Sequence, residues 1–140
     1  MNSIEVLLIE DNIYDAELAI RELRKNNLAN EIVHIEDGGE ARDYIFCKGK
    51  YENRKGENPR LILLDLNLPK VSGIELLREI KENPATRHIP VIVMAASRLD
   101  PDIDTCYKLG ANSYVPKPVD LENFVKSVSQ VGIYWLLVNK

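Results

Sequence analysis

The 140-residue sequence lacks the features that direct a chain into a membrane, out of the cell or onto a nucleic acid. No uninterrupted apolar run approaches the roughly 18 residues that a membrane-spanning helix needs. The first residues, MNSIEVLLIED, have neither the basic stretch nor the cleavage site of a secretory signal. The net charge is −4, so we do not expect the basic surface typical of proteins that bind nucleic acids.

Cysteine is also scarce. Cys47 and Cys106 are the only two, they lie far apart, and neither belongs to a CxxC motif. We therefore expect neither a zinc site nor a disulfide framework, and we predict that both cysteines pack on helices as small apolar residues. With 45% hydrophobic and 29% charged residues, the composition is that of an ordinary globular domain. We expect a single domain over residues 1–140, in the cytoplasm.

Short apolar runs that alternate with helical patterns are the most prominent feature of the chain. The runs are predicted to be buried strands at Val6–Ile9, Ile32–Ile35, Leu61–Leu64, Val91–Met94 and Ser113–Val115. Helical patterns follow each of them, over about 13–26, 40–47, 73–82, 101–109 and from residue 120 onward, with Ser72 and Asp120 as N-caps and Gly110 as the C-terminal stop. This alternation predicts an α/β fold with a doubly wound, five-stranded parallel sheet and helices on both faces.

One segment, residues 48–60 (KGKYENRKGENPR), interrupts the alternation. It has five basic and two acidic residues and no periodicity. A solvated loop is the simpler interpretation of this insertion, and a docking element for a partner protein is the alternative.

Charged residues follow three of the predicted strands. Glu10 and Asp11 come after the first strand, Asp65 after the third and Lys117 after the fifth. The carboxyl ends of parallel strands lie at one edge of the sheet, where such folds bind their ligands. Three carboxylates gathered there would repel one another and raise their pKa values, a conflict that Mg²⁺ resolves. Lys117 could pair with Asp65 or with a phosphoryl group.

Each of these residues has a simpler explanation when it is taken alone. Glu10 and Asp11 precede a helix and could be N-terminal caps. Asp65 could begin a turn, and Lys117, between two prolines, could be a solvated loop residue. Charged residues at the ends of all three strands are much harder to explain by chance, so we favour one shared site.

Five motifs carry a resemblance to a known family: VLLIEDN at 6–12, LILLDLNLP at 61–69, Ser72-Gly73, Gly110-Ala111 and YVPKP at 114–118. With them the chain resembles the receiver domains of response regulators, with a flavodoxin-like fold, over nearly its whole length. The resemblance implies a two-component signalling protein that accepts a phosphoryl group from a sensor histidine kinase on Asp65. It also implies that Glu10, Asp11, Asp65 and the backbone carbonyl of Asn67 hold Mg²⁺, and that Lys117 contacts the phosphoryl oxygens. Such a protein catalyses only its own phosphorylation and dephosphorylation.

The chain departs from this family at the end of the fourth strand. Receiver domains usually carry Thr or Ser where this chain has Ala95, and the hydroxyl hydrogen-bonds the phosphoryl group. The nearest hydroxyl, that of Ser97, is two residues further on. We expect the chemistry at Asp65 to survive, whereas the coupling of phosphorylation to Tyr114, the usual switch residue, is in question.

Other classes of protein fit less well. A dehalogenase-type phosphatase needs a second acid two residues after its nucleophile, and Asn67 is an amide. A flavodoxin-type module needs a phosphate-binding loop where this chain has Glu10 and Asp11. A pseudo-receiver that acts as a scaffold without phosphorylation stays open as an alternative, although the complete set of acids disfavours it.

The C-terminal extension, at about 132–140, predicts self-association. From residue 133 to 138 the chain reads IYWLLV, and one helix face cannot bury all of these side chains against its own domain. We expect a homodimer whose interface includes Ile133, Trp135, Leu136 and Leu137. Together with the insertion, this end of the chain resembles the single-domain regulators that partner bacterial phytochromes and related sensor kinases.

Overall fold

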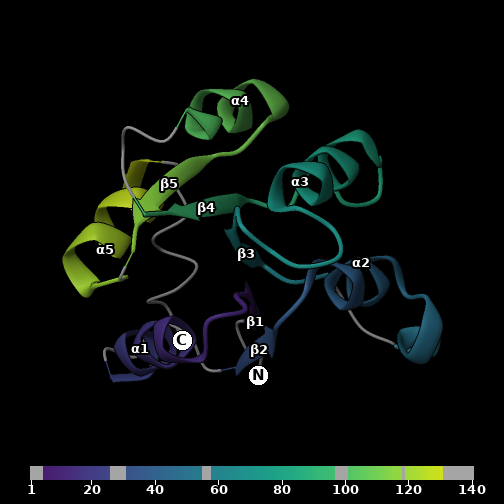
Figure 1. Ribbon diagram of the computed structural model, residues 1–140, viewed down its shortest axis with the longest axis horizontal. Helices are drawn as coiled ribbons and strands as arrows, with labels where there is room; N and C mark the ends of the chain where they lie inside the picture. The colour runs from purple at the N-terminus through teal and green to yellow at the C-terminus, as the bar shows by residue number, and fades with distance from the viewer. Residues whose placement is uncertain (1–4, 26–30, 55–57, 97–100, 118, 131–140) are drawn as a thin grey trace.

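The computed structural model describes residues 5–25, 31–54, 58–96, 101–117 and 119–130 (Figure 1). Its centre is a parallel sheet of five strands in the order β2-β1-β3-β4-β5. The strands are β1 (Glu5–Ile9), β2 (Glu31–Ile35), β3 (Leu61–Asp65), β4 (Val91–Ala95) and β5 (Ser113–Pro116). The predicted doubly wound sheet is therefore confirmed, with strand ends within one residue of those expected.

Five α-helices cover the two faces of the sheet. They are α1 (Ile13–Lys25), α2 (Gly38–Phe46), α3 (Gly73–Glu82), α4 (Asp102–Leu109) and α5 (Leu121–Gln130). Figure 1 shows α1 and α5 on one face and α2, α3 and α4 on the other. Among the described residues, no helix is long and apolar enough to cross a bilayer.

The three inner strands, β1, β3 and β4, are buried on both faces, which explains their continuous apolar sequences. In β1, Val6 and Leu8 pack toward α1 and α5, whereas Leu7 and Ile9 pack toward α2, α3 and α4. The residues of β3 alternate in the same way, and all of these side chains are inaccessible to solvent. This burial leaves polar groups only at the strand ends.

Short-range contacts fix where the helices begin and end. The predicted caps form: Ser72 Oγ accepts from the Glu75 backbone N–H (3.2 Å), and Asp120 Oδ1 accepts from that of Asn123 (2.8 Å). Gly110 ends α4 with φ = 113°, a left-handed conformation that favours glycine. The cap of α2 was not predicted: Asp37 Oδ1 accepts from the Glu40 backbone N–H at 2.7 Å.

Part of the insertion is anchored rather than loose. Residues Gly49–Tyr51 form a 3₁₀-helix, η1, and the Tyr51 ring meets the Tyr44 ring edge-on at 5.0 Å. The Arg54 guanidinium lies 4.3 Å from the centre of the Tyr44 ring, and its Nε donates to the Tyr44 carbonyl (2.8 Å). These contacts attach residues 49–54 to α2, so the simple solvated loop does not describe them. Residues 55–57 lie outside the described residues.

The two cysteines differ. Cys106, on α4, is buried in the core, as predicted. Cys47 is exposed and follows α2 with φ = 56°, so its expected packing role is wrong. The cause is the sharp left-handed turn into the insertion, which carries the side chain away from the core.

Candidate functional site

The sheet register brings the charged strand ends together. Ile9 lies beside Leu64, so Glu10 and Asp65 follow at the same level of adjacent strands. Ala95 of β4 lies beside Pro116 of β5, and Lys117 comes next. Hydrogen bonds secure this edge: the Glu10 N–H donates to the Ile35 carbonyl and the Lys117 N–H donates to the Ala95 carbonyl, at 3.0 and 2.9 Å. The predicted convergence is therefore present.

Three acids form what we call the acidic cluster: Glu10, Asp11 and Asp65. One carboxylate oxygen of each lies within 4.8 Å of those of the other two. Glu10 and Asp65 are each only 1% exposed, whereas Asp11 is exposed. The cluster thus has a buried floor of two carboxylates and a third at its open side.

Lys117 lies against the floor of the acidic cluster. Its Nζ is 3.2 Å from Glu10 Oε1 and 3.3 Å from Asp65 Oδ2, and its side chain is 17% exposed. Burial alone would lower the pKa of Lys117, but Asp65 and Glu10 outweigh it and the pKa is raised. The ammonium group is therefore a permanent positive charge beside two buried carboxylates.

The carboxyl of Glu10 has the most perturbed environment of the cluster. Burial is the largest cause that raises its pKa, and the neighbouring Asp65 raises it further. A hydrogen bond from the Asn12 N–H to Oε2 (3.0 Å) and the charge of Lys117 act in the opposite direction. The net result is a pKa of about 7. A single lysine therefore does not compensate both buried acids.

The two carboxylate oxygens of Asp65 differ in their hydrogen bonding. Oδ1 accepts from the Asn67 N–H at 3.3 Å. In the part of the chain that the structure describes, no donor is aligned for a hydrogen bond with Oδ2, although Lys117 Nζ lies within ion-pairing distance. A buried carboxylate oxygen without a hydrogen bond costs free energy unless another ligand binds it.

The start of α3 packs against the backbone of Asp65 and Leu66. The Gly73 N–H donates to the Leu66 carbonyl at 3.1 Å, and a Cβ at position 73 would overlap the Asp65 carbonyl and Leu66 Cα. Only glycine lets the helix approach this closely. The backbone that carries Asp65 is therefore clamped between β3 and α3.

The donor set fits a hard divalent cation. Three carboxylates with an open side toward solvent suit Mg²⁺, which takes few protein ligands and keeps several waters. Asn67 is exposed and follows Asp65 by two residues. Its backbone carbonyl remains a predicted fourth ligand.

The end of β4 offers the site no hydroxyl. Ala95 is buried at the last position of β4, and Ser97 lies outside the described residues. Tyr114 is partly buried on β5, and its carbonyl accepts from Ser127 Oγ at 2.8 Å. Ala95, where the chain departs from the family, therefore lies beside Lys117 and accepts a hydrogen bond from its backbone N–H.

Sequence reasoning missed one charged member of the site. Asp15 Oδ2 lies 3.5 Å from Lys117 Nζ, and Asp15 sits in the first turn of α1. The available signal was its position: Asp15 lies in the first turn of the helix that closely follows Glu10 and Asp11.

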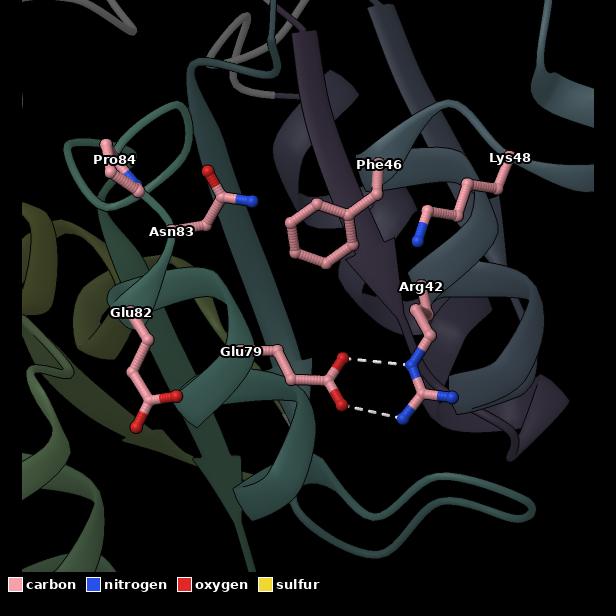
Figure 2. Close-up of a pocket in the computed structure, with 7 residues that line it drawn as sticks. All are labelled: Arg42, Phe46, Lys48, Glu79, Glu82, Asn83 and Pro84. Carbon is pink, nitrogen blue, oxygen red and sulfur yellow. Dashed lines mark hydrogen bonds and ion pairs between the residues drawn. The ribbon is translucent and has the colours of Figure 1, made fainter.

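A hollow between α2 and α3 is separate from this site (Figure 2). Both helices run back from the carboxyl edge of the sheet, and the hollow lies at their far ends. Arg42 crosses it with a two-pronged ion pair to Glu79, with N···O distances of 2.9 and 2.6 Å. The other lining residues are Phe46, Lys48, Glu82, Asn83 and Pro84, none of them a predicted site residue.

This fold and site define the class of protein. Residues 6–129 match the family of response regulator receiver domains, and the chain belongs to that family. This match favours a signalling protein of a two-component system over the dehalogenase-type phosphatase and the flavodoxin-type module. Receiver domains bind divalent metal ions, in agreement with the acidic cluster.

Response regulators of similar length are among the relatives of the chain. The chain is 38% identical over 131 residues to response regulator Rcp1 of Synechocystis sp., covering 94% of this chain and 88% of Rcp1. The Mn²⁺-bound form of Rcp1 superimposes with a TM-score of 0.77, at 36% identity over 97% of this chain and 95% of the other.

Two further solved structures are also similar. The bacteriophytochrome response regulator AtBRR is 44% identical, with a TM-score of 0.90 and full coverage of both chains. The phosphorylated cyanobacterial phytochrome response regulator RcpA is 37% identical, with a TM-score of 0.81 over 99% of this chain and 98% of the other. The predicted resemblance to phytochrome regulators is confirmed at the level of homology.

Proposed function

We propose that the protein is a phosphorylated response regulator in which Asp65 accepts a phosphoryl group from a sensor histidine kinase in a Mg²⁺-dependent reaction. The observation that carries the proposal is the state of Asp65. Its carboxylate is buried, and Oδ2 accepts no hydrogen bond from the described residues. The only described cation within ion-pairing distance of Oδ2 is Lys117 Nζ. This is the arrangement that an in-line carboxylate nucleophile requires.

In the proposed reaction, Asp65 Oδ2 attacks the phosphorus atom of a phosphohistidine. The new P–O bond forms as the P–N bond breaks, and the imidazole leaves with the electron pair of that bond and takes up a proton from solvent. The product is an acyl phosphate on Asp65. The clamp formed by β3 and α3 keeps the carboxylate in place during this transfer, and positioning is the main requirement of phosphoryl transfer.

Charge neutralisation is the second requirement. We propose that Glu10, Asp11, Asp65 and the Asn67 carbonyl hold the cation, which supplies charge for the transferring oxygens when it is bound. Lys117 would then turn its ammonium from Asp65 Oδ2 to a phosphoryl oxygen. We favour Mg²⁺ because the ligands are hard oxygens and the open side leaves room for retained waters.

We propose that signalling follows by protein–protein contact. The acyl phosphate carries about two negative charges where the Asp65 carboxylate carried one, and this change can reorganise adjacent loops. The relatives named for phytochromes favour a phytochrome-type or related sensor kinase as the donor, in the cytoplasm. We also retain a homodimer through Ile133, Trp135, Leu136 and Leu137, which lie outside the described residues. No nucleic acid or membrane takes part.

Intact-mass spectrometry after incubation with a small phosphodonor tests the proposal. Wild type is expected to gain one phosphoryl mass with Mg²⁺ and none in EDTA, and Asp65→Asn is expected to gain none. Asp104→Asn, which removes an exposed acid from α4, is the matched control and should behave as wild type. An increment that persists in Asp65→Asn would assign the acceptor elsewhere. A wild type that gains nothing with Mg²⁺ would favour the pseudo-receiver scaffold.

A further inference from the structure

Lys117 has three carboxylate partners, and they are not equivalent. Glu10 and Asp65 belong to the acidic cluster, whereas Asp15 does not. The Asp15 contact is the longest of the three, at 3.5 Å, and the Asp15 side chain is 31% exposed. Asp15 therefore forms an outer, partly solvated partner for an ammonium group whose other two partners are buried.

Occupation of the acidic cluster changes the balance among these partners. With a divalent cation bound, Glu10 and Asp65 would hold the cation, and their attraction for Lys117 would be largely cancelled. Asp15 lies outside the cluster and keeps its full charge. Asp15, 3.5 Å from Lys117 Nζ in this structure, would then be the main anion that holds the ammonium on the α1 side.

We propose that Asp15 is a positioning residue that retains Lys117 near α1 and competes with the phosphoryl group for its ammonium. This inference rests on the proposed function, because it concerns the same phosphoryl site. Two effects act in the same direction: Asp15 attracts the lysine away from the phosphoryl oxygens, and its charge repels the incoming anion. The result is a weaker hold on the phosphoryl group than Lys117 alone would provide.

The expected effect is modest because Asp15 is partly exposed. Ion pairs of this kind change an equilibrium by up to about fivefold. Asp15→Asn, which keeps the size of the side chain and its place in the first turn of α1, is therefore expected to tighten the binding of a phosphoryl mimic by about two- to fivefold.

Beryllofluoride binding at saturating Mg²⁺ tests the proposal, with dissociation constants from NMR titrations of backbone amides. Two variants serve as controls. Glu17→Gln removes an exposed acid from the same helix, two residues further on, and should change affinity less than about 1.5-fold. Asp15→Glu keeps the charge and can still reach Lys117, so it should restore an affinity near that of wild type.

The outcomes separate this inference from the proposed function. Equal dissociation constants for Asp15→Asn and Glu17→Gln, or weaker binding by Asp15→Asn, would overturn the role of Asp15 and leave Asp65 as the acceptor. Tighter binding in both Asp15→Asn and Asp15→Glu would also overturn it, because the charge would then not be the cause. A wild type that binds no beryllofluoride would overturn both proposals.

Discussion

The buried carboxyl of Glu10 predicts an unusual dependence of stability on pH. In the folded, metal-free protein the pKa of Glu10 is about 7, against 4.5 for an unperturbed glutamate. The folded state therefore holds this proton to a higher pH than the unfolded state does. The stability that protonated Glu10 contributes is complete below pH 4.5 and is lost as the pH rises through about 7.

The size of the effect follows from the shift. Each unit of pKa difference corresponds to about 1.4 kcal/mol, so a rise from 4.5 to about 7 corresponds to about 3 kcal/mol. Glu10 is 1% exposed, so solvent screening does not reduce this value much. Glu10→Gln stays neutral at every pH and should not lose this contribution.

Urea unfolding in EDTA between pH 5 and pH 8 measures the difference. The free energy of unfolding of Glu10→Gln, relative to wild type, is expected to rise by about 2.5 kcal/mol across this range, because part of the contribution is already lost at pH 5, with most of the rise before pH 7.5. Glu17→Gln, on the exposed face of α1, should run parallel to wild type. Parallel curves for Glu10→Gln and wild type would refute the argument that burial keeps Glu10 protonated.

Three further predictions address the switch, the clamp and the dimer. Ala95→Thr supplies the missing hydroxyl, a hydrogen bond of about 1.5–3 kcal/mol to a charged group, and should enlarge the NMR response of Tyr114 to beryllofluoride; an unchanged response would mean that this chain signals without that coupling. Gly73→Ala places a methyl group against the Asp65–Leu66 backbone and should cost about 1–3 kcal/mol in urea unfolding and slow the phosphorylation of Asp65; wild-type values would show that α3 can shift freely. Light scattering should give about 32 kDa for wild type, twice 15.9 kDa, and about 16 kDa for Ile133→Asp/Leu137→Asp. A monomeric wild type would contradict the dimer.

The sheet and the main charges of the site were predictable because one rule governs both. A strand buried on both faces must be apolar throughout, so the first charged residue marks its end. In β1 and β3 this residue is Glu10 or Asp65, and parallel pairing places such ends at one level. The local caps at Ser72 and Asp120 were predictable for a similar reason, since each depends on contacts within four residues.

The features that were missed depend on contacts between distant segments. Nothing near Tyr51 or Arg54 in the sequence indicates that both would pack on Tyr44 of α2. The exposure of Cys47 follows from the turn that this packing requires. Asp15 was missed because its partner Lys117 is about a hundred residues away, and only the fold shows that α1 passes beside the end of β5.

The two outer strands of the open sheet limit how copies of the protein can associate. An unpaired strand edge is a template for sideways growth of a sheet. Here one edge strand, β5, has four residues and ends in Pro116, which has no N–H to donate. The other, β2, starts with the exposed Glu31, and its His34 ring contacts the Glu10 carbonyl. Neither edge offers a long apolar template, so the addition of a strand from a second copy to either edge of the sheet is disfavoured.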